Sequence, residues 1–414
     1  MEITAKIEGI EYTPYLCREL REYTLDEFEL ALNKDATFIL NVDDKHKLAV
    51  SWWVSAKRTR SYPYARVYDS LGFSGKKVTI IPIFKDEGRD GDRDFLQWDT
   101  ISLMSLLCVY VIIGYYSDAI PSSRYSNKIT NQQFDIPYLK SQIKKILSYQ
   151  SDALHWNITQ TEKVWAIGKK ALECYDEISR KTGVEMHSHK TAEKRFEKLE
   201  EGKDAFMELS RDLAKRAQER ESITTQPKEK VDGTKAVITI KNYLGGNYYF
   251  TSDEVELHNN DIWLIDAKHT KTDNLPSLGD IKDGLLKMML FTNLVDVKMS
   301  GKNLNPIPIL KLTTGKGFSI DTLTDKQKEL LKRQRLSPDN DWLNSQANAV
   351  ADHIRAATFA IADGVVPSNE ARGYVIRKLI RRSITYLKQV GVQRPLCFGM
   401  VYSIAKAMEN AYPE

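Results

Sequence analysis

Residues 253–268 read DEVELHNNDIWLIDAK, and this stretch decides the core of the fold. Two runs that favour β-strands flank the polar segment 258–261, which has the composition of a turn, so we predict a β-hairpin. Side chains alternate between the two faces of a strand, which places Asp266 and Lys268 on the same face. The partner strand can then bring Asp253 beside them.

Two carboxylates and one lysine are the smallest set of side chains that can support metal-dependent hydrolysis of a phosphodiester. A hard divalent cation activates water and stabilises the leaving alkoxide, and Mg²⁺ needs few protein oxygens because it keeps several waters. We predict Asp253 and Asp266 as metal ligands, with the backbone carbonyl of Ala267 as a further ligand. Lys268 would contact the phosphate and position or deprotonate the attacking water. The predicted cofactor is Mg²⁺, for which Mn²⁺ can substitute.

Two neighbouring acids are possible site residues, but less favoured than Asp253. Glu254 and Glu256 fall on the opposite face from Asp253 if the strand is regular, and a β-bulge would exchange these assignments. The plainer alternative for the whole hairpin is a surface element with two solvated acids.

The hairpin resembles the PD-(D/E)XK nuclease superfamily, with Asp253 as the first acid and residues 266–268 as the second acid, spacer and lysine. Ser252 stands where the superfamily usually has proline. Residues 280–291, which read DIKDGLLKMMLF, look like the helix that commonly follows the hairpin. Lys287 on this helix is, like Glu254 and Glu256, a possible further site residue. Alternatively, it forms an ordinary surface ion pair with the acid four residues earlier. The resemblance covers about residues 190–300 and implies a restriction-endonuclease-like core, a mixed sheet flanked by helices.

The C-terminal part of the chain carries a basic helical pattern. Gly364 is suited to closing one helix, and residues 367–369 to forming a turn and cap. The next helix carries five basic residues around an apolar stripe, an arrangement that suits a nucleic-acid backbone: Arg372, Arg377, Lys378, Arg381 and Arg382. The alternative is a solvated basic helix that packs on the rest of the protein.

This segment, about residues 345–414, resembles the tRNA-recognition region of alanyl-tRNA synthetase. The similarity lies in ADHIRAATF (351–359), IADGVVPSNE (361–370) and RGYVIRKLIRR (372–382), while Ala371 stands where that family usually has glycine. The resemblance implies that Asn369 lies in the loop that approaches the acceptor-stem minor groove of alanine tRNA. Class II aminoacylation motifs and the editing-domain clusters are not found, so aminoacylation is not expected.

Length and composition indicate an ordinary globular chain. The 414 residues, of which 42% are hydrophobic, predict two or three domains, and the net charge of +4 assigns any nucleic-acid binding to local patches. The four cysteines are widely spaced, and we recognise no signal peptide, so we expect the reducing cytoplasm and no membrane. The apolar run 101–116 is too short to span a bilayer and predicts a buried helix.

We predict three domains and an α/β fold class. An α+β domain covers residues 1–155, the nuclease domain 156–335, and the helical nucleic-acid-binding module 336–414. Residues 190–221 predict a long amphipathic helix, and 222–234 a linker. His187 and His189 are expected in a solvated turn. The acidic loop 86–94 lacks calcium-binding spacing and is expected to be solvated, although it follows a strand end.

The leading functional hypothesis is a Mg²⁺-dependent endonuclease of the restriction or phage-defence type. Its substrate would be DNA, with the C-terminal module as clamp or sensor, and a homodimer would suit cleavage of both strands. The first alternative is a nuclease that binds and cleaves alanine tRNA. The second is a catalytically inactive tRNA-binding interaction protein.

Overall fold

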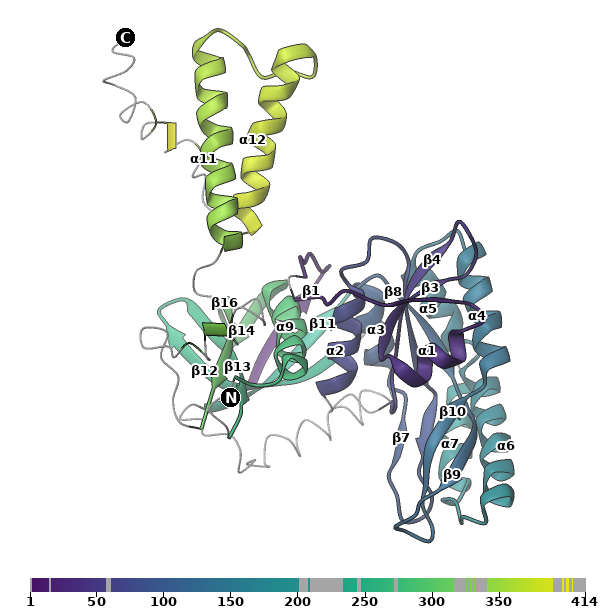
Figure 1. The fold of residues 1–414 in the computed structure, drawn as a ribbon. Coiled ribbons are helices and arrows are strands. Elements are labelled where there is room, and N and C mark those ends of the chain that lie inside the picture. The colour runs from purple at the N-terminus through teal and green to yellow at the C-terminus, as the bar shows by residue number, and fades with distance from the viewer. Residues whose placement is uncertain are drawn as a thin grey trace. The chain divides into compact units, whose positions relative to one another are not determined.

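The computed structural model describes residues 2–14, 16–56, 61–200, 234–243, 247–271, 275–315 and 341–389, with single positions at 208, 325, 328, 329, 331, 397, 400, 401 and 404. It is a mixed α/β protein, as predicted, and it divides into two compact units, Met1–Ser319 and Ile320–Glu414 (Figure 1). The predicted linker 222–234 lies almost wholly outside the described residues, as does most of the predicted helix beyond residue 200.

A five-stranded sheet forms one half of the first unit, in the order β2-β3-β4-β5-β8. All its neighbouring strands are parallel except β3 and β4. β5 and β8 are buried along nearly their whole length, which is typical of strands covered on both faces. Its strands are β2 (Glu22–Thr24), β3 (Thr37–Asn41), β4 (Lys47–Trp52), β5 (Lys77–Pro82) and β8 (Val109–Gly114).

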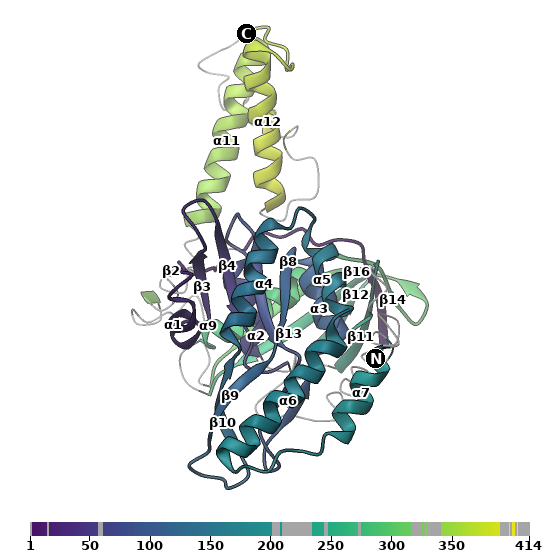
Figure 2. The same ribbon diagram turned by 90° about the vertical axis from the view of Figure 1, so that its right-hand side faces the viewer.

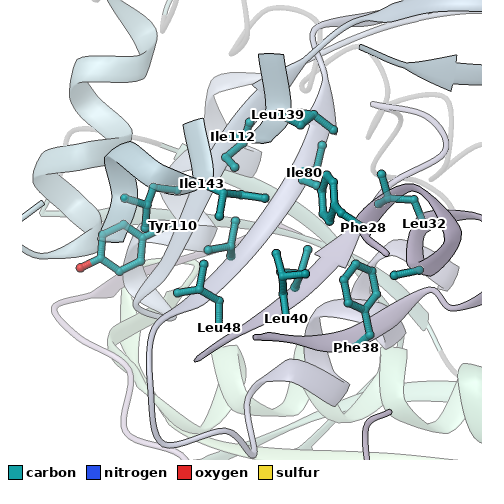
Figure 3. Close-up of a cluster of buried hydrophobic side chains, with 14 of the residues drawn as sticks. Phe28, Leu32, Phe38, Leu40, Leu48, Ile80, Tyr110, Ile112, Leu139 and Ile143 are labelled. Carbon is teal, nitrogen blue, oxygen red and sulfur yellow. The ribbon is translucent and has the colours of Figure 1, made fainter. Parts of the chain in front are cut away.

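Helices pack on this sheet through apolar side chains. Phe28 and Leu32 of α1 (Phe28–Lys34) and Leu139 and Ile143 of α4 (Ile136–Ser148) join one buried cluster with residues of the strands, among them Ile80 (Figure 3). α2 (Ser61–Ser70), α3 (Trp98–Leu106) and α5 (Ala153–Thr161) also contact the strands. This part of the chain therefore has its own hydrophobic core.

The sequence predicts a single buried helix over residues 101–116, and this prediction is wrong. The run forms the end of α3 and then β8, with Cys108 between them at φ 56°. The residues after Cys108 are mostly β-branched, and such side chains pack well on a pleated surface. Burial was predicted correctly, but apolar content alone did not separate helix from strand.

Two β-ribbons and two helices extend from this sheet. Figure 2 shows α6 (Val164–Thr182) running beside β9 (Tyr116–Pro121), with α7 (Lys190–Glu200) next to it. β9 pairs with β10 (Ile129–Phe134), and β6 (Phe84–Asp86) pairs with β7 (Arg93–Phe95).

A seven-stranded mixed sheet forms the other half of the first unit, in the order β15-β14-β1-β11-β12-β13-β16. Its strands are β1 (Glu2–Ile7), β11 (Thr234–Asn242), β12 (Asn247–His258), β13 (Asp261–His269), β14 (Leu294–Met299), β15 (Lys302–Asn303) and β16 (Asn305–Thr313). β1 pairs in parallel with β11. The expected domain 1–155 therefore contributes a strand to the sheet of the expected domain 156–335.

Polar contacts join the two halves of this unit. α9 (Leu278–Thr292) packs against β13 and β16 and also against α2, where Lys282 pairs with Asp69. Asn242 and Tyr248 of the seven-stranded sheet both donate to the Ser102 hydroxyl of α3, at 2.6 and 2.9 Å. Buried hydrogen bonds of this kind require accurate docking, since a displaced partner leaves a polar group unsatisfied.

The second unit contains the helices α11 (Asp341–Ala362) and α12 (Ala371–Gln389), which pack against each other. Gly364, at φ 85°, follows α11 and confirms the predicted closing glycine. None of the helices in the described part of the chain is long and apolar enough to cross a membrane.

Candidate functional site

The predicted hairpin is confirmed as β12 and β13, which pair antiparallel from Glu254–Ile265 to His258–Asp261. Asn259 in the connecting turn has φ 57°, a conformation that asparagine tolerates well. β13 then pairs in parallel with β16, so the second acid lies on a strand that has a neighbour on each side. The site is thus carried by the sheet and not by a loop.

Asp266 is at the centre of a cluster of charged side chains. It is fully buried, and its Oδ1 accepts a hydrogen bond from Lys287 Nζ at 2.6 Å. Its Oδ2 lies 3.0 Å from Lys268 Nζ. Lys268 also donates to Asp283 Oδ2 at 2.7 Å. We call these four residues together with Asp253 the Asp266 cluster.

The lysines and Asp266 of the Asp266 cluster favour one another's ionised state. Burial alone would raise the pKa of Asp266, but Lys287 and Lys268 outweigh it and hold that pKa below its ordinary value. Burial would likewise lower the pKa of Lys287, yet Asp266, Asp283 and Asp253 raise it well above its ordinary value. The pKa of Asp283 is raised, because its burial outweighs the attraction of Lys268.

Asp253 is tied to the adjacent strand. Its Oδ2 accepts a hydrogen bond from the Ala267 N–H at 2.7 Å, and its charge contributes to the raised pKa of Lys287. Ser252, at the usual proline position, donates to the Ile265 carbonyl at 2.9 Å and so joins the two strands. The structure therefore brings Asp253, Asp266 and Lys268 together.

The two acids of second choice lie elsewhere. Glu254 pairs with Lys311 of β16 at 2.8 Å, and Glu256 contacts His258 at 2.9 Å. The bulge considered from the sequence exists between β11 and β12, but the β12–β13 register is regular. Glu254 consequently points away from Asp266.

Helix α9 completes the Asp266 cluster, and the sequence reasoning missed one of its residues. Asp283 and Lys287 lie four residues apart, which suggested a surface pair, but both side chains reach β13. A Cβ added to Gly284 between them would lie 2.5 Å from Leu310 Cδ1 and 3.3 Å from Lys268 Cε. This glycine allows the helix to approach the sheet closely. A glycine next to an acid inside a predicted helix was the sequence signal that could have pointed to Asp283 as a site residue.

The carboxylates of the Asp266 cluster suit a single divalent cation. Asp266 Oδ2 is buried, and the positive charge at ion-pair distance from it is the Lys268 ammonium, at 3.0 Å. A divalent ion bound to Asp266 would therefore share this carboxylate with lysine. Among the described residues no group of three or more histidine, cysteine, aspartate or glutamate side chains could hold a metal. Mg²⁺ is commonly bound by one or two carboxylates and several waters, which matches what Asp253 and Asp266 offer.

The acidic loop and the two histidines make contacts within the protein: His187 contacts the loop, and His189 contacts α6. His187 Nδ1 lies 2.8 Å from Asp86 Oδ1, which also accepts the Gly88 N–H, and His189 pairs with Asp176 at 3.4 Å. Asp86 is almost fully buried, so the expectation of a solvated loop is wrong at this position, whereas residues 89, 90 and 92 are exposed. The contact between His187 and Asp86 joins the β6–β7 ribbon to the segment before α7.

The second unit presents the five basic side chains of α12 to solvent, as predicted. Asn369 does not simply cap the helix, because its side-chain oxygen accepts a hydrogen bond from Arg377, while the Glu370 N–H donates to Ser368 Oγ. Ala371 has φ 46°, a conformation that favours glycine, and it is the position where the resemblance noted a departure. The loop is therefore held against the first turns of α12.

Comparison with known proteins shows a similarity in the C-terminal part of the chain. A family model for class II (A) tRNA synthetases matches residues 319–414. Alanine–tRNA ligase of Lysinibacillus sphaericus is 50% identical over 72 residues, which are 17% of this chain and 8% of the ligase. The ligase of Geobacillus thermodenitrificans is 52% identical over 65 residues, or 16% and 7% of the two chains.

The ligase of Nitrosospira multiformis matches a longer stretch, 37% identical over 126 residues, covering 28% of this chain and 15% of the ligase. The chain thus spans under a sixth of the length of the curated relatives it matches. No solved structure matches the chain. The C-terminal segment is a tRNA-synthetase-like region, and the family model matches no residue before 319.

Proposed function

We propose that this protein is a metal-dependent endonuclease that binds tRNA of the alanine type through Ile320–Glu414 and hydrolyses its phosphodiester bonds at the Asp266 cluster. The observation that carries the proposal is the coexistence, on one chain, of that cluster and a segment 50% identical to alanine–tRNA ligase. The hairpin followed by a packed helix supports a restriction-endonuclease-like core for Met1–Ser319.

Each residue of the Asp266 cluster has a chemical task in this proposal. Asp253 and Asp266 would hold Mg²⁺, with the Ala267 carbonyl as a further ligand, and the ion would activate water and stabilise the leaving oxygen. Lys268, held between Asp266 and Asp283, is suited to contact a non-bridging phosphate oxygen and to orient the attacking water. Asp283 and Lys287 position these groups from α9.

The choice of tRNA over DNA rests on the second unit. DNA would be favoured because most nucleases of this class cut DNA. Residues 319–414, however, match a tRNA synthetase family, and the similar proteins are alanine–tRNA ligases. The exposed basic residues of α12, with Asn369 at the start of the helix, support contact with an RNA backbone. Ligase activity is not carried over, because the match covers only 8% of that enzyme. A cytoplasmic location, a homodimer and a defence role remain predictions.

Cleavage by the full-length protein tests the proposal. Purified protein with Mg²⁺ is offered alanine tRNA, an unrelated tRNA, duplex DNA and single-stranded DNA. We expect alanine tRNA to be cut fastest, EDTA to stop the reaction, and Mn²⁺ to restore it. Lys268→Met should lower the rate by about 10²–10⁴-fold.

Lys311→Met is the matched control, because Lys311 is also a strand lysine paired with an acid, but that acid points away from Asp266. It should cleave at the wild-type rate. Faster cutting of duplex DNA than of any tRNA would instead support the restriction-type alternative. Specific binding of alanine tRNA without cleavage of any substrate would support the alternative that the protein is a catalytically inactive tRNA-binding protein.

A further inference from the structure

Lys287 occupies the kind of position in which a cation is expected. Its Nζ is 2.6 Å from Asp266 Oδ1, and the carboxylates of Asp283 and Asp253 also attract its charge. The side chain is only 17% exposed. An ammonium paired with a buried carboxylate compensates its negative charge.

We propose that the Lys287 ammonium is the resident cation of the Asp266 cluster, so that the loaded site takes one divalent ion and not two. The inference rests on the proposed metal-dependent function and specifies how its site is charged. Lys287 would stay on Asp266 Oδ1 when the divalent ion binds. Asp266 would hold the ion through Oδ2, where Lys268 Nζ lies 3.0 Å away and would have to yield.

Charge balance favours one ion. The Asp266 cluster contains three carboxylates and two ammonium groups, which leaves one net negative charge. One divalent ion would turn this into one positive charge, which a phosphodiester neutralises. Two ions would leave three positive charges in a largely buried site. The third carboxylate, Asp283, is paired with Lys268, and in the described part of the chain no group of three or more histidine, cysteine, aspartate or glutamate side chains could hold a metal.

Asp283 explains how the ion could enter without expelling a lysine. Lys268 is shared between Asp266 at 3.0 Å and Asp283 at 2.7 Å. A divalent ion at Asp266 Oδ2 would repel Lys268, which retains Asp283 as its partner. Asp283 is therefore assigned as a positioning residue.

Titration of the full-length protein with Mn²⁺, followed by electron paramagnetic resonance of free Mn²⁺, tests the proposal without measuring activity. We expect one Mn²⁺ per wild-type chain, lost in Asp266→Asn. Lys287→Met removes the resident charge and should bind Mn²⁺ at least tenfold more tightly. Lys282→Met is the matched control, since Lys282 is also a buried lysine of α9 paired with an aspartate, but Asp69 lies outside the cluster. It should leave the Mn²⁺ affinity unchanged.

Two results would overturn the inference: two Mn²⁺ ions per wild-type chain that are lost in Asp266→Asn, or equal Mn²⁺ affinity in wild type and Lys287→Met. The wild-type stoichiometry decides the matter even if Lys287→Met does not fold. These results leave the proposed nuclease intact. Failure of the wild type to bind any Mn²⁺, with cleavage persisting in EDTA, would remove the metal-dependent function itself.

Discussion

Replacing Asp266 by asparagine should destabilise the unit Met1–Ser319 even when no metal is present. The substitution keeps the shape but removes the charge that lies 2.6 Å from Lys287 Nζ. Removing one partner of a buried ion pair costs about 3–5 kcal/mol, because the other charge remains buried. We expect the lower end, about 3 kcal/mol, since Lys268 retains Asp283 and Lys287 is 17% exposed.

Thermal unfolding in EDTA, followed by circular dichroism, measures this cost. The unfolding entropy is about 2.1 cal/mol/K per residue, so for the unit Met1–Ser319 about 1 kcal/mol shifts Tm by about 1.5 °C, and about 3 kcal/mol corresponds to about 4–5 °C. The double variant Asp266→Asn/Lys287→Met removes both charges, and its cost should fall short of the sum of the two single costs by about 1–3 kcal/mol.

Glu254→Gln is the control. Its partner Lys311 is 41% exposed, so we expect a cost of at most about 1 kcal/mol. Equal Tm values for Asp266→Asn and Glu254→Gln, or strictly additive costs in the double variant, would refute the buried charge cluster.

Two further predictions concern the basic helix and an ion pair remote from the Asp266 cluster. Arg381→Glu/Arg382→Glu should weaken tRNA binding and lower the slope of log affinity against log salt by about 0.7–0.9 for each lost phosphate contact, measured by filter binding. An unchanged slope would make α12 purely structural. Burial raises the pKa of Glu87, but Lys128 and Lys85 outweigh it and lower that pKa to about 2. A lowered pKa adds stability above the unfolded value near 4.5, which is lost as the pH falls toward 2, so Glu87→Gln should unfold with a weaker dependence on pH over that range; identical pH profiles would contradict the pairing.

The hairpin residues of the candidate site could be predicted, because their positions follow from sequence patterns within one short stretch. Alternation along residues 253–268 placed Asp266 and Lys268 on one face, and the hairpin turn brought Asp253 to them. The nuclease resemblance predicted the helix now seen as α9, and the closing glycine, the turn and the apolar stripe predicted the two helices of the second unit. Each of these features depends on residues close together in the chain.

The sequence by itself determined the hairpin, the helices that follow it and the synthetase-like character of the C-terminal segment. Only the tertiary structure decided that β1 joins β11 across more than 200 residues, that 101–116 divides into helix and strand, and that Asp283 and Lys287 turn toward Asp266. Periodicity reports which side of an element is apolar or charged, but not which distant element covers it. The pairing of Lys287 with Asp266 depends on how closely α9 packs on the sheet, and that packing is a property of the whole unit.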